Sequence, residues 1–179
     1  MSHITRLLNH GPTTLITSAH ASQCNIMAAA WVCALDFNPA KVTVVIDSKI
    51  YTRELIATEG TFAINLPCVQ QLEMVKQVGS ISGRDLPGTD KFVDYGIETF
   101  AAQAISAPLV KGCVGWLECK IIPEPHNQGT YDLFIAEVVA AHADERVFSE
   151  GRWHFEGHDD LRTIHHIAGG VFFATGQPC

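Results

Sequence analysis

The sequence predicts a mainly β fold with a few α-helices, and three observations favour a closed or nearly closed barrel. Short runs rich in Val, Ile and Thr recur along the chain, whereas few stretches have helical spacing. Turn-forming residues separate these runs at regular intervals. No Gly/Ser linker, internal repeat or composition break divides the sequence, so we expect one domain over residues 1–179. Many short strands with few helices favour a barrel over a doubly wound sheet.

The first elements have the signature of a β-hairpin. Residues 13–19 are a β-branched run, and residues 25–35 are a second extended run, with the polar segment 20–23 between them. Residues 41–47 (KVTVVID) are nearly continuous Val, Ile and Thr. This composition is expected of a strand that is buried on both faces or lines a barrel.

A helix is then expected over residues 51–59. Thr52 is a possible cap, and Gly60 is expected to end the helix. Residues 61–66 (TFAINL) resume strand character, and residues 69–78 have the apolar spacing of an amphipathic helix. A short helix therefore follows the strand at 41–47, and a second helix follows the strand at 61–66.

Strands are expected to dominate the second half, after an irregular loop at residues 80–88 and a turn or short helix at 90–95. The expected strands are residues 114–122, 131–141 and a short 146–148. Near the C-terminus, His165 and His166 with Gly169 and Gly170 predict a turn that leads into residues 171–173. That segment is expected to close over a pocket or to pack at the barrel edge.

The composition argues against several classes of function. The chain has 179 residues, 12 scattered Lys and Arg, and a net charge of -7, which argues against a nucleic-acid surface. No stretch approaches the roughly 18 to 20 apolar residues of a membrane span, and the N-terminus does not resemble a leader, so we expect a cytoplasmic protein. The hydrophobic fraction of 47% is slightly high, and an excess of this kind is often buried between subunits.

No metal site is predicted. The six cysteines form no CxxC pair and no Cys/His zinc pattern, and the histidines at 154, 158, 165 and 166 match no common spacing. We expect reduced, mostly buried cysteines, with Cys179 exposed at the terminus. The GxGxxG, GxxxxGK[ST] and GxSxG motifs are also missing, so neither a dinucleotide fold, a nucleotide triphosphatase nor a hydrolase is indicated.

Two segments are candidates for a binding site. The strand segment 27–30 (MAAA) has side chains small enough for a flat ring to approach its backbone, although close packing of strands or subunits explains it equally well. The segment 48–53 places hydroxyls with Lys49 and Arg53 at a helix start, which suits a phosphate, although capping and solvated cations explain it too. Ser82, Arg84 and Lys91 form a second set of donors with the same ambiguity.

Taken in order, six segments resemble the flavin reductase-like family, and its flavoredoxin branch most closely. They are PTTLIT (12–17), NIMAAAW (25–31), SKIYT (48–52), GTFAINLP (60–67), SGRD (82–85) and DKF (90–92). The resemblance extends from about Pro12 to Phe173, which is nearly the whole chain. An ordered set of this kind is more specific than any one of its motifs.

The resemblance implies a split β-barrel that binds FMN, or less readily FAD, without a covalent bond at a homodimer interface. The flavin ring and ribityl chain would lie along Asn25, Met27, Ala28, Ala29 and Ala30, and the phosphate would contact Ser48, Lys49 and Thr52. Further contacts carried over from the family are Trp31, Ser82, Arg84, Lys91 and Phe172.

The implied function is that of an FMN-dependent oxidoreductase, in which NADH or NADPH reduces bound flavin and electrons pass to a second acceptor such as a monooxygenase. The alternatives are a flavoredoxin-type electron carrier between proteins and a non-catalytic module that holds flavin or haem. Hydride transfer needs no side-chain acid or base, so no catalytic residue is assigned. Many relatives carry Gly-Asp-His where this chain has QGTYD (128–132), which leaves the electron donor open.

Overall fold

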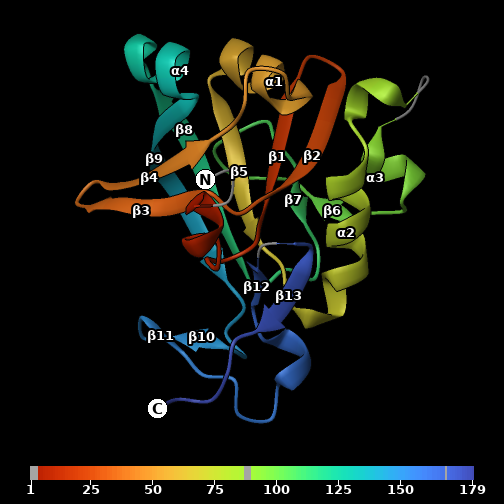
Figure 1. The fold of residues 1–179 in the computed structure, drawn as a ribbon, viewed down its shortest axis with the longest axis vertical. Coiled ribbons are helices and arrows are strands. Elements are labelled where there is room, and N and C mark those ends of the chain that lie inside the picture. Colours follow the sequence, from red (N-terminus) through yellow and green to blue (C-terminus); the bar gives the residue numbers. More distant parts are fainter. Residues whose placement is uncertain (1–3, 87–89, 168) are drawn as a thin grey trace.

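Seven antiparallel strands form one curved sheet at the centre of the computed structural model, which describes residues 4–86, 90–167 and 169–179 (Figure 1). The strand order is β2-β1-β5-β8-β9-β4-β3. The strands are β1 (Thr14–His20), β2 (Gln23–Ala29), β3 (Val32–Phe37), β4 (Ala40–Val45), β5 (Thr61–Leu66), β8 (Gly115–Ile122) and β9 (Leu133–Ala143).

Strands β2 and β3 are consecutive in the chain but lie at opposite ends of this order. Because only Ala30 and Trp31 join them, the sheet must curl until its two edges approach each other. At this junction the backbone N–H of Val45 donates to the carbonyl of Trp31 at 3.1 Å. The result is a mainly β barrel that is split between β2 and β3, which confirms the predicted fold class.

Successive side chains of each strand point to opposite faces of the sheet, and this divides the core into two clusters. Ile16 belongs to a cluster inside the barrel with Phe62, whereas its neighbour Leu15 faces the opposite side and packs against Val75 and Val78 of a helix. All five side chains are buried, and full burial of such a side chain contributes roughly 1.5–3 kcal/mol. The period-2 pattern therefore fixes which side chains fill the barrel and which hold the helix against it.

The helices are short and lie at the barrel's ends and flank (Figure 1). Helix α1 covers residues 51–59 as predicted, and Gly60 ends it with φ of 77° and an N–H bond to the Ile56 carbonyl at 2.8 Å. The helical elements are η1 (Ile4–Leu7), α1 (Tyr51–Glu59), η2 (Val69–Gln71), α2 (Leu72–Ser80), η3 (Gly83–Asp85), α3 (Lys91–Asp94), α4 (Pro125–Tyr131) and η4 (Asp159–Leu161).

Three sequence predictions in the first half need correction. The extended run over residues 25–35 is two strands, because the chain breaks at Ala30–Trp31 to cross from one sheet edge to the other. Thr52 is not a cap: the N-cap position is Ile50, and the Thr52 side chain points into the core. The expected loop at 80–88 begins one residue late, since Ser80 still belongs to α2, and it contains η3; residues 87–88 lie outside the described residues.

The strand predicted over residues 131–141 begins only at Leu133, because residues 125–131 form the unpredicted helix α4. Pro125 suits the first turn, and Asp132 ends the helix in the left-handed conformation with φ of 55°. Arg53 of α1 holds α4 in place by donating to the Gln128 carbonyl at 2.6 Å and to Asp132 at 2.9 Å. Tertiary contact therefore stabilises a helix that local composition does not favour.

Three short hairpins complete the second half. The strand expected at 146–148 is displaced, since Phe148 begins β10 and the preceding residues form a turn. The predicted turn near the C-terminus is confirmed at Gly169 and Gly170, but His165 and His166 lie in strand β12 and not in the turn. The hairpins are β6 (Thr99–Phe100) with β7 (Leu109–Val110), β10 (Phe148–Ser149) with β11 (Arg152–Trp153), and β12 (Ile164–Ile167) with β13 (Val171–Ala174).

The cysteines are free thiols. Cys68, Cys113 and Cys119 are buried as expected, whereas Cys33 is exposed together with Cys179. Burial raises the pKa of the Cys119 thiol to about 12. Within the described residues, no helix is both long and apolar enough to cross a membrane.

Candidate flavin-binding cleft

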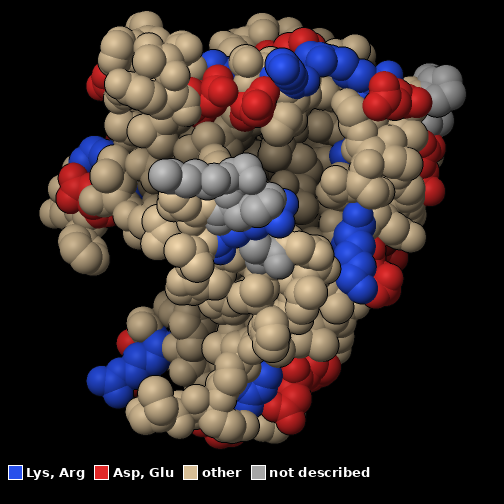
Figure 2. All heavy atoms as spheres, in the orientation of Figure 1, with Lys and Arg blue, Asp and Glu red and all other residues tan. Residues whose placement is uncertain are grey.

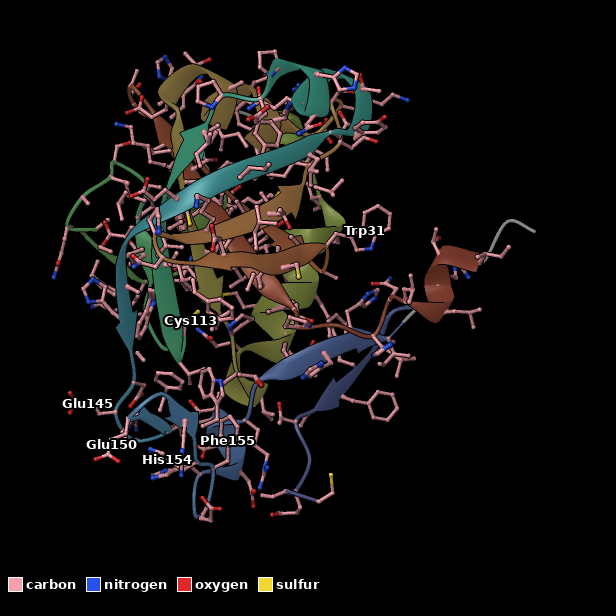
Figure 3. The ribbon with its side chains drawn as sticks, turned by 90° about the vertical axis from the view of Figure 1, so that its left-hand side faces the viewer. Trp31, Cys113, Glu145, Glu150, His154 and Phe155 are labelled. Carbon is pink, nitrogen blue, oxygen red and sulfur yellow. The ribbon has the colours of Figure 1, made fainter. Side chains whose placement is uncertain are left out.

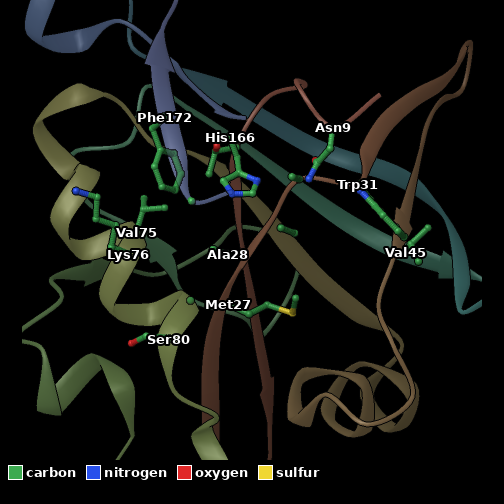
Figure 4. Close-up of a pocket in the computed structure, with 15 residues that line it drawn as sticks. Asn9, Met27, Ala28, Trp31, Val45, Val75, Lys76, Ser80, His166 and Phe172 are labelled. Carbon is green, nitrogen blue, oxygen red and sulfur yellow. The ribbon is translucent and has the colours of Figure 1, made fainter. Parts of the chain in front are cut away.

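A cleft of about 570 Å³ opens along β2, where the two edges of the sheet face each other (Figure 4). Met27 and Ala28 of β2 lie between the side chains of α2 and those of the β3 side. His166 and Phe172 reach toward it from the β12–β13 hairpin, with their ring centroids 5.1 Å apart. The lining residues are Asn9, Thr13, Met27, Ala28, Ala29, Ala30, Trp31, Val45, Val75, Lys76, Gly79, Ser80, His166, Gly170 and Phe172.

The wall formed by β2 has two properties that suit a planar polar ring. As an end strand, β2 pairs with β1 on one side only, so its outer backbone groups are not used by another strand of the described sheet. Its side chains are also small, and α2 approaches so closely that a Cβ added to Gly79 would lie 3.4 Å from the Cβ of Ala28. A flat apolar group can therefore reach backbone donors along this strand.

Buried polar atoms without partners occur both in the cleft and near the second hollow. The Thr13 hydroxyl and the Asn9 side-chain oxygen line the cleft, and neither has a hydrogen-bond partner among the described residues. The Asn25 side chain is 2% exposed, and its Oδ1 atom is likewise unpartnered there. Because a buried oxygen without a bond costs about 1–3 kcal/mol, these atoms favour a bound polar molecule or water.

Asn25 forms a polar corner between β2, α1 and η3. Its Nδ2 atom donates to the Thr52 hydroxyl at 2.8 Å. Thr52, in the first turn of α1, therefore forms one side of this corner. Gly83 packs directly on the amide: an added Cβ would lie 2.5 Å from Asn25 Oδ1 and 2.9 Å from the ring of Tyr51. A second hollow of about 620 Å³ lies here, and Asn25, Tyr51, Gly83 and Arg84 are among its lining residues.

Ser48 and Lys49 lie exposed in the turn before α1. The Lys49 backbone N–H donates to Asp47 at 2.8 Å, which fixes the turn. Basic side chains gather over α1 and the adjoining loop toward α3, along the upper edge of Figure 2. Arg53 does not join them, because its guanidinium bonds the Ile46 carbonyl at 2.7 Å as well as α4, and it lies 4.6 Å from the ring centre of Phe134.

The η3 loop lies against this turn. Arg84 donates to the Lys49 carbonyl at 3.0 Å and pairs with Glu54, while the Ser82 hydroxyl accepts the Arg84 backbone N–H at 3.3 Å. Ser82 therefore caps the loop, and Arg84 joins it to α1. Part of the Arg84 charge is offset by Glu54 rather than free for an anion, which the sequence alone does not reveal.

Lys91 lies in the interior and not on the cleft surface. Its side chain is 2% exposed, and its ammonium donates to the Val78 carbonyl at 2.6 Å and to the Ile26 carbonyl at 3.1 Å. Val78 belongs to the last turn of α2, where the helix dipole favours a cation. Burial lowers the pKa of Lys91 to about 8. The lysine thus joins the two elements that form the cleft wall.

Of the residues predicted from the sequence, Met27, Ala28, Ala29, Ala30, Trp31 and Phe172 line the cleft, and Asn25 and Arg84 line the second, separate hollow. Sequence reasoning missed His166, Asn9, Thr13 and the α2 residues Lys76, Gly79 and Ser80, which reach the cleft from distant parts of the chain. The one available signal was the Gly169-Gly170 turn, which placed residues 171–173 over a pocket. Among the described residues, no group of His, Cys, Asp and Glu side chains is arranged to hold a metal.

Known proteins share both the sequence and the fold. The model of the flavin reductase like domain matches residues 7–161. An uncharacterised Escherichia coli protein, YddH, is 45% identical over 180 residues, 99% of this chain and 93% of its own length. A crystal structure of an FMN-binding domain of a flavin reductase-like enzyme from Shewanella baltica is 50% identical, with a TM-score of 0.89 over 97% of this chain and 91% of that chain.

A more distant relative has a named activity. The reductase component of a 4-nitrophenol monooxygenase from Rhodococcus opacus is 26% identical over 130 residues, which are 73% of this chain and 64% of the relative. The matched domain model covers well over half of the sequence. The chain therefore belongs to the flavin reductase-like family.

Proposed function

We propose that this protein binds FMN without a covalent bond in the cleft along β2. The observation that carries the proposal is the cleft wall itself: residues 27–30 line it along the end strand β2, and the Thr13 and Asn9 side-chain oxygens there have no partner among the described residues. A ligand with a flat ring and polar groups matches such a wall. The Shewanella baltica relative is itself named as an FMN-binding domain.

Each part of the flavin would have a chemically suited neighbour. Met27, Ala28, Ala29 and Ala30 would face the ring, with Trp31 and Phe172 at its margins, and Asn25 would hold the ribityl chain. Ser48 and Lys49 would take the phosphate at the start of α1, where free N–H groups attract anions. Thr52, Ser82, Arg84 and Lys91 would support these groups through the bonds described above. When bound, FMN supplies hydride and single-electron chemistry, while the protein supplies orientation and exclusion of water.

We further propose NAD(P)H-dependent flavin reduction as the activity, with electrons passing to a separate acceptor such as a monooxygenase. The Rhodococcus opacus relative, a monooxygenase reductase component, supports this proposal. The cleft volume of about 570 Å³ leaves room for a second flat group beside a ring held against β2, with His166 among the lining residues. An electron carrier that exchanges electrons only with other proteins is the alternative.

Two measurements test the proposal. Purified protein incubated with FMN should show a flavin spectrum after gel filtration, and a colourless protein would refute flavin binding. A Soret band instead of flavin absorbance would assign a haem module. Anaerobic addition of NADH or NADPH should then bleach the flavin band rapidly, whereas a bound flavin that neither nucleotide bleaches would assign the carrier.

A homodimer with the flavin near the interface is also part of the proposal. Large apolar side chains remain exposed near the split of the barrel, including Trp31, which is 54% exposed and lines the cleft. Leu35 and Phe37 of β3 and Val171 and Phe173 of β13 are exposed as well. Several large apolar side chains left exposed in this way favour a subunit contact.

A further inference from the structure

The β3–β4 hairpin extends from the barrel as an arm whose outer strand is uncovered. All residues from Cys33 to Phe37 are exposed, with Leu35 at 51% and Phe37 at 98%. Figure 1 shows the hairpin projecting beyond the rest of the sheet. The Lys41 ammonium forms an ion pair with the Asp36 carboxylate of the arm, with Nζ and Oδ2 2.7 Å apart. The arm therefore presents apolar side chains to its surroundings and pairs its own charges.

An uncovered arm of this composition is suited to a partner. A two-stranded hairpin is marginally stable in water, and β3 packs only Val32 against the core of its own chain, while Cys33 to Phe37 stay exposed. Full burial of a phenylalanine side chain contributes roughly 1.5–3 kcal/mol, so Phe37 offers a large gain to any complex that covers it. A complex that covers the arm is therefore favoured.

A pocket that fits one aromatic side chain lies elsewhere on the same chain. It has a volume of about 290 Å³ and is lined by Trp116, His142, Phe148 and Trp153, with Leu66, Leu117 and small residues of β8 and β9. A cavity of about 150 Å³ is known to hold benzene, so a phenyl ring has room here. The lining is almost entirely apolar, and His142 is the one titratable group among the lining residues.

The walls of this pocket are held in place by neighbouring groups. Trp116 donates its indole N–H to the Val110 carbonyl at 2.8 Å. Trp153 packs edge-on against Phe148 with ring centroids 4.8 Å apart, and it stacks on Phe155 at 5.5 Å. His142 lies 3.4 Å from the buried Glu118 carboxylate. A pocket with fixed aromatic walls loses little entropy when it is filled.

The arm and the pocket occupy one side of the molecule. The β3–β4 hairpin and the β10–β11 hairpin both project to the left in Figure 1, and Figure 2 shows the surface hollowed between them. Figure 3 looks directly at this side, with Trp31 at the root of the arm and Phe155 beside the lower hairpin. A protrusion and a complementary pocket on one face allow two copies to engage each other twice about a two-fold axis.

We propose that a second copy of this chain covers the arm, with Phe37 of each copy inserted in the Trp116–Phe148–Trp153 pocket of the other. This inference rests on the homodimer proposed above and assigns the contact that forms it. Trp31 links the contact to function, since it lies at the root of the arm and also lines the cleft. A partner seated on the arm therefore borders the mouth of the cleft and restricts access to it.

The arm is tested by comparing two surface substitutions. Phe37→Glu places a charge at the arm tip, and Val93→Glu, at a side chain 71% exposed on α3 on the other side of the molecule, is the matched control. Sedimentation equilibrium should give a dimer for the wild-type protein and for Val93→Glu, with the dimer dissociation constant raised at least about tenfold in Phe37→Glu. Circular dichroism should be unchanged, because Phe37 makes little contact within its own chain.

Different results would refute the homodimer and the arm-and-pocket contact. A wild-type protein that is monomeric at every concentration would refute the proposed homodimer together with the contact. A wild-type dimer that Phe37→Glu leaves equally tight would keep the homodimer and overturn the arm-and-pocket contact. That second result is also the one expected if the pocket serves a small ligand or another protein, because the arm would then not contribute to self-association.

A cross-linking experiment provides the second, independent measurement. In a background where Cys33 and Cys179 are replaced by Ser, one batch carries Phe37→Cys and another carries Trp153→Cys. Mixing the batches under mild oxidation should yield a covalent dimer that neither batch forms alone. Equal amounts of cross-linked product in the mixture and in the separate batches would contradict the proposal.

Discussion

At the scale of one residue, Asn25 joins strand β2 to helix α1 and lines the second hollow. Its amide nitrogen bonds Thr52 inside α1, while its oxygen has no partner among the described residues and lies against the backbone of Gly83. The amide nitrogen thus serves the fold, whereas the buried oxygen is an acceptor without a partner among the described residues. The family resemblance predicted Asn25 as a flavin contact, but only the structure distinguishes its bonded nitrogen from its unpartnered oxygen.

Replacing Asn25 by Ala should therefore affect binding as well as stability. We expect the dissociation constant for FMN, measured by fluorescence titration, to rise about tenfold, which corresponds to the loss of one hydrogen bond of about 1.4 kcal/mol. Asn65 is the matched control, because it is a fully buried amide bonded to Leu15, Thr17 and Val110 away from the cleft. Asn65→Ala should lower the free energy of unfolding and leave FMN affinity unchanged. Equal effects of both substitutions on FMN affinity would argue against a direct role of Asn25.

Lys91 allows a prediction about stability and its dependence on pH. Lys91→Met removes the bonds to the Ile26 and Val78 carbonyls, so the free energy of unfolding at pH 7 should fall by about 1–3 kcal/mol. Burial lowers the folded-state pKa to about 8 from an ordinary value of 10.5, so between these values the unfolded state binds the proton more readily. The contribution of Lys91 to the free energy of unfolding should therefore rise with pH from about 8 to 10.5 and stay constant below 8.

The free energies of unfolding of the wild type and of Lys91→Met can be measured by urea unfolding from about pH 7 to 10.5. Their difference reports on Lys91 alone, because all other groups that titrate in this range are present in both proteins. Lys120, exposed on β8, provides the control substitution Lys120→Met, which should follow the wild type. If the difference between wild type and Lys91→Met stayed flat from pH 7 to 10.5, the lowered pKa would be wrong.

At the scale of elements, the strands were predictable where local pattern and tertiary role agree. Residues 41–47 have the pattern of a strand lining a barrel, and their odd and even positions do alternate between the interior and the outer face. Helix α4 was not predictable, because Asn127, Gly129 and Thr130 disfavour a helix that Arg53 stabilises from a distance of more than seventy residues. The break at Ala30 was equally hidden, since it follows from which strands pair and not from local composition.

The residues of the candidate cleft were likewise only partly predictable from the sequence. Residues 27–30 stood out because three alanines are unusual in a strand, whereas His166 and Asn9 gave no local signal of a shared site. Only the fold brings them near β2. Conversely, Arg53 and Lys91 looked like phosphate donors, yet the structure uses both to bind backbone carbonyls between elements.

Glu118 provides the element-scale prediction, because its buried carboxylate holds the segment at residues 103–104 against β8. Its oxygens accept the Gln103 N–H at 2.9 and 3.1 Å and the Ala104 N–H at 2.6 Å. Glu118→Gln leaves a single acceptor and turns an amide N–H₂ toward these donors. We expect the free energy of unfolding at pH 7 to fall by about 2–3 kcal/mol, whereas Glu98→Gln in an exposed pair should change it by less than about 1 kcal/mol.

The effect of Glu118 should disappear in acid. Burial raises the pKa of this carboxyl, but the N–H donors and His142 outweigh burial, and the net pKa lies below the ordinary 4.5. The stabilising contribution is therefore complete above about pH 4.5 and is lost as the pH falls through the folded-state pKa. The stability difference between wild type and Glu118→Gln, followed by urea unfolding, should shrink below pH 4.5. A constant difference down to pH 3 would contradict this assignment.

At the scale of the whole molecule, the split in the barrel connects the proposed flavin site with the proposed dimer contact. The same two-residue crossing at Ala30–Trp31 ends the cleft wall and begins the arm. A ligand that orders this crossing and a partner that covers the arm therefore act on one structural element. Two binding events that share an element are coupled, and thermodynamic linkage makes the coupling reciprocal.

The final prediction is that FMN binding and dimer formation strengthen each other by the same factor. Saturating FMN should lower the dimer dissociation constant, and Phe37→Glu, when monomeric, should bind FMN more weakly than the wild-type dimer by an equal factor, of about 5- to 150-fold for a typical coupling. Sedimentation with and without FMN gives the first factor, and fluorescence titration of both proteins gives the second. Riboflavin, which lacks the phosphate, tests whether the coupling passes through the ring. It should produce the same factor, because in the proposed pose the ring lies beside Ala30 and Trp31 and the phosphate lies at Lys49, away from the crossing. Equal dimer affinities with and without FMN would show that the crossing at Ala30–Trp31 is already fully ordered in the free protein.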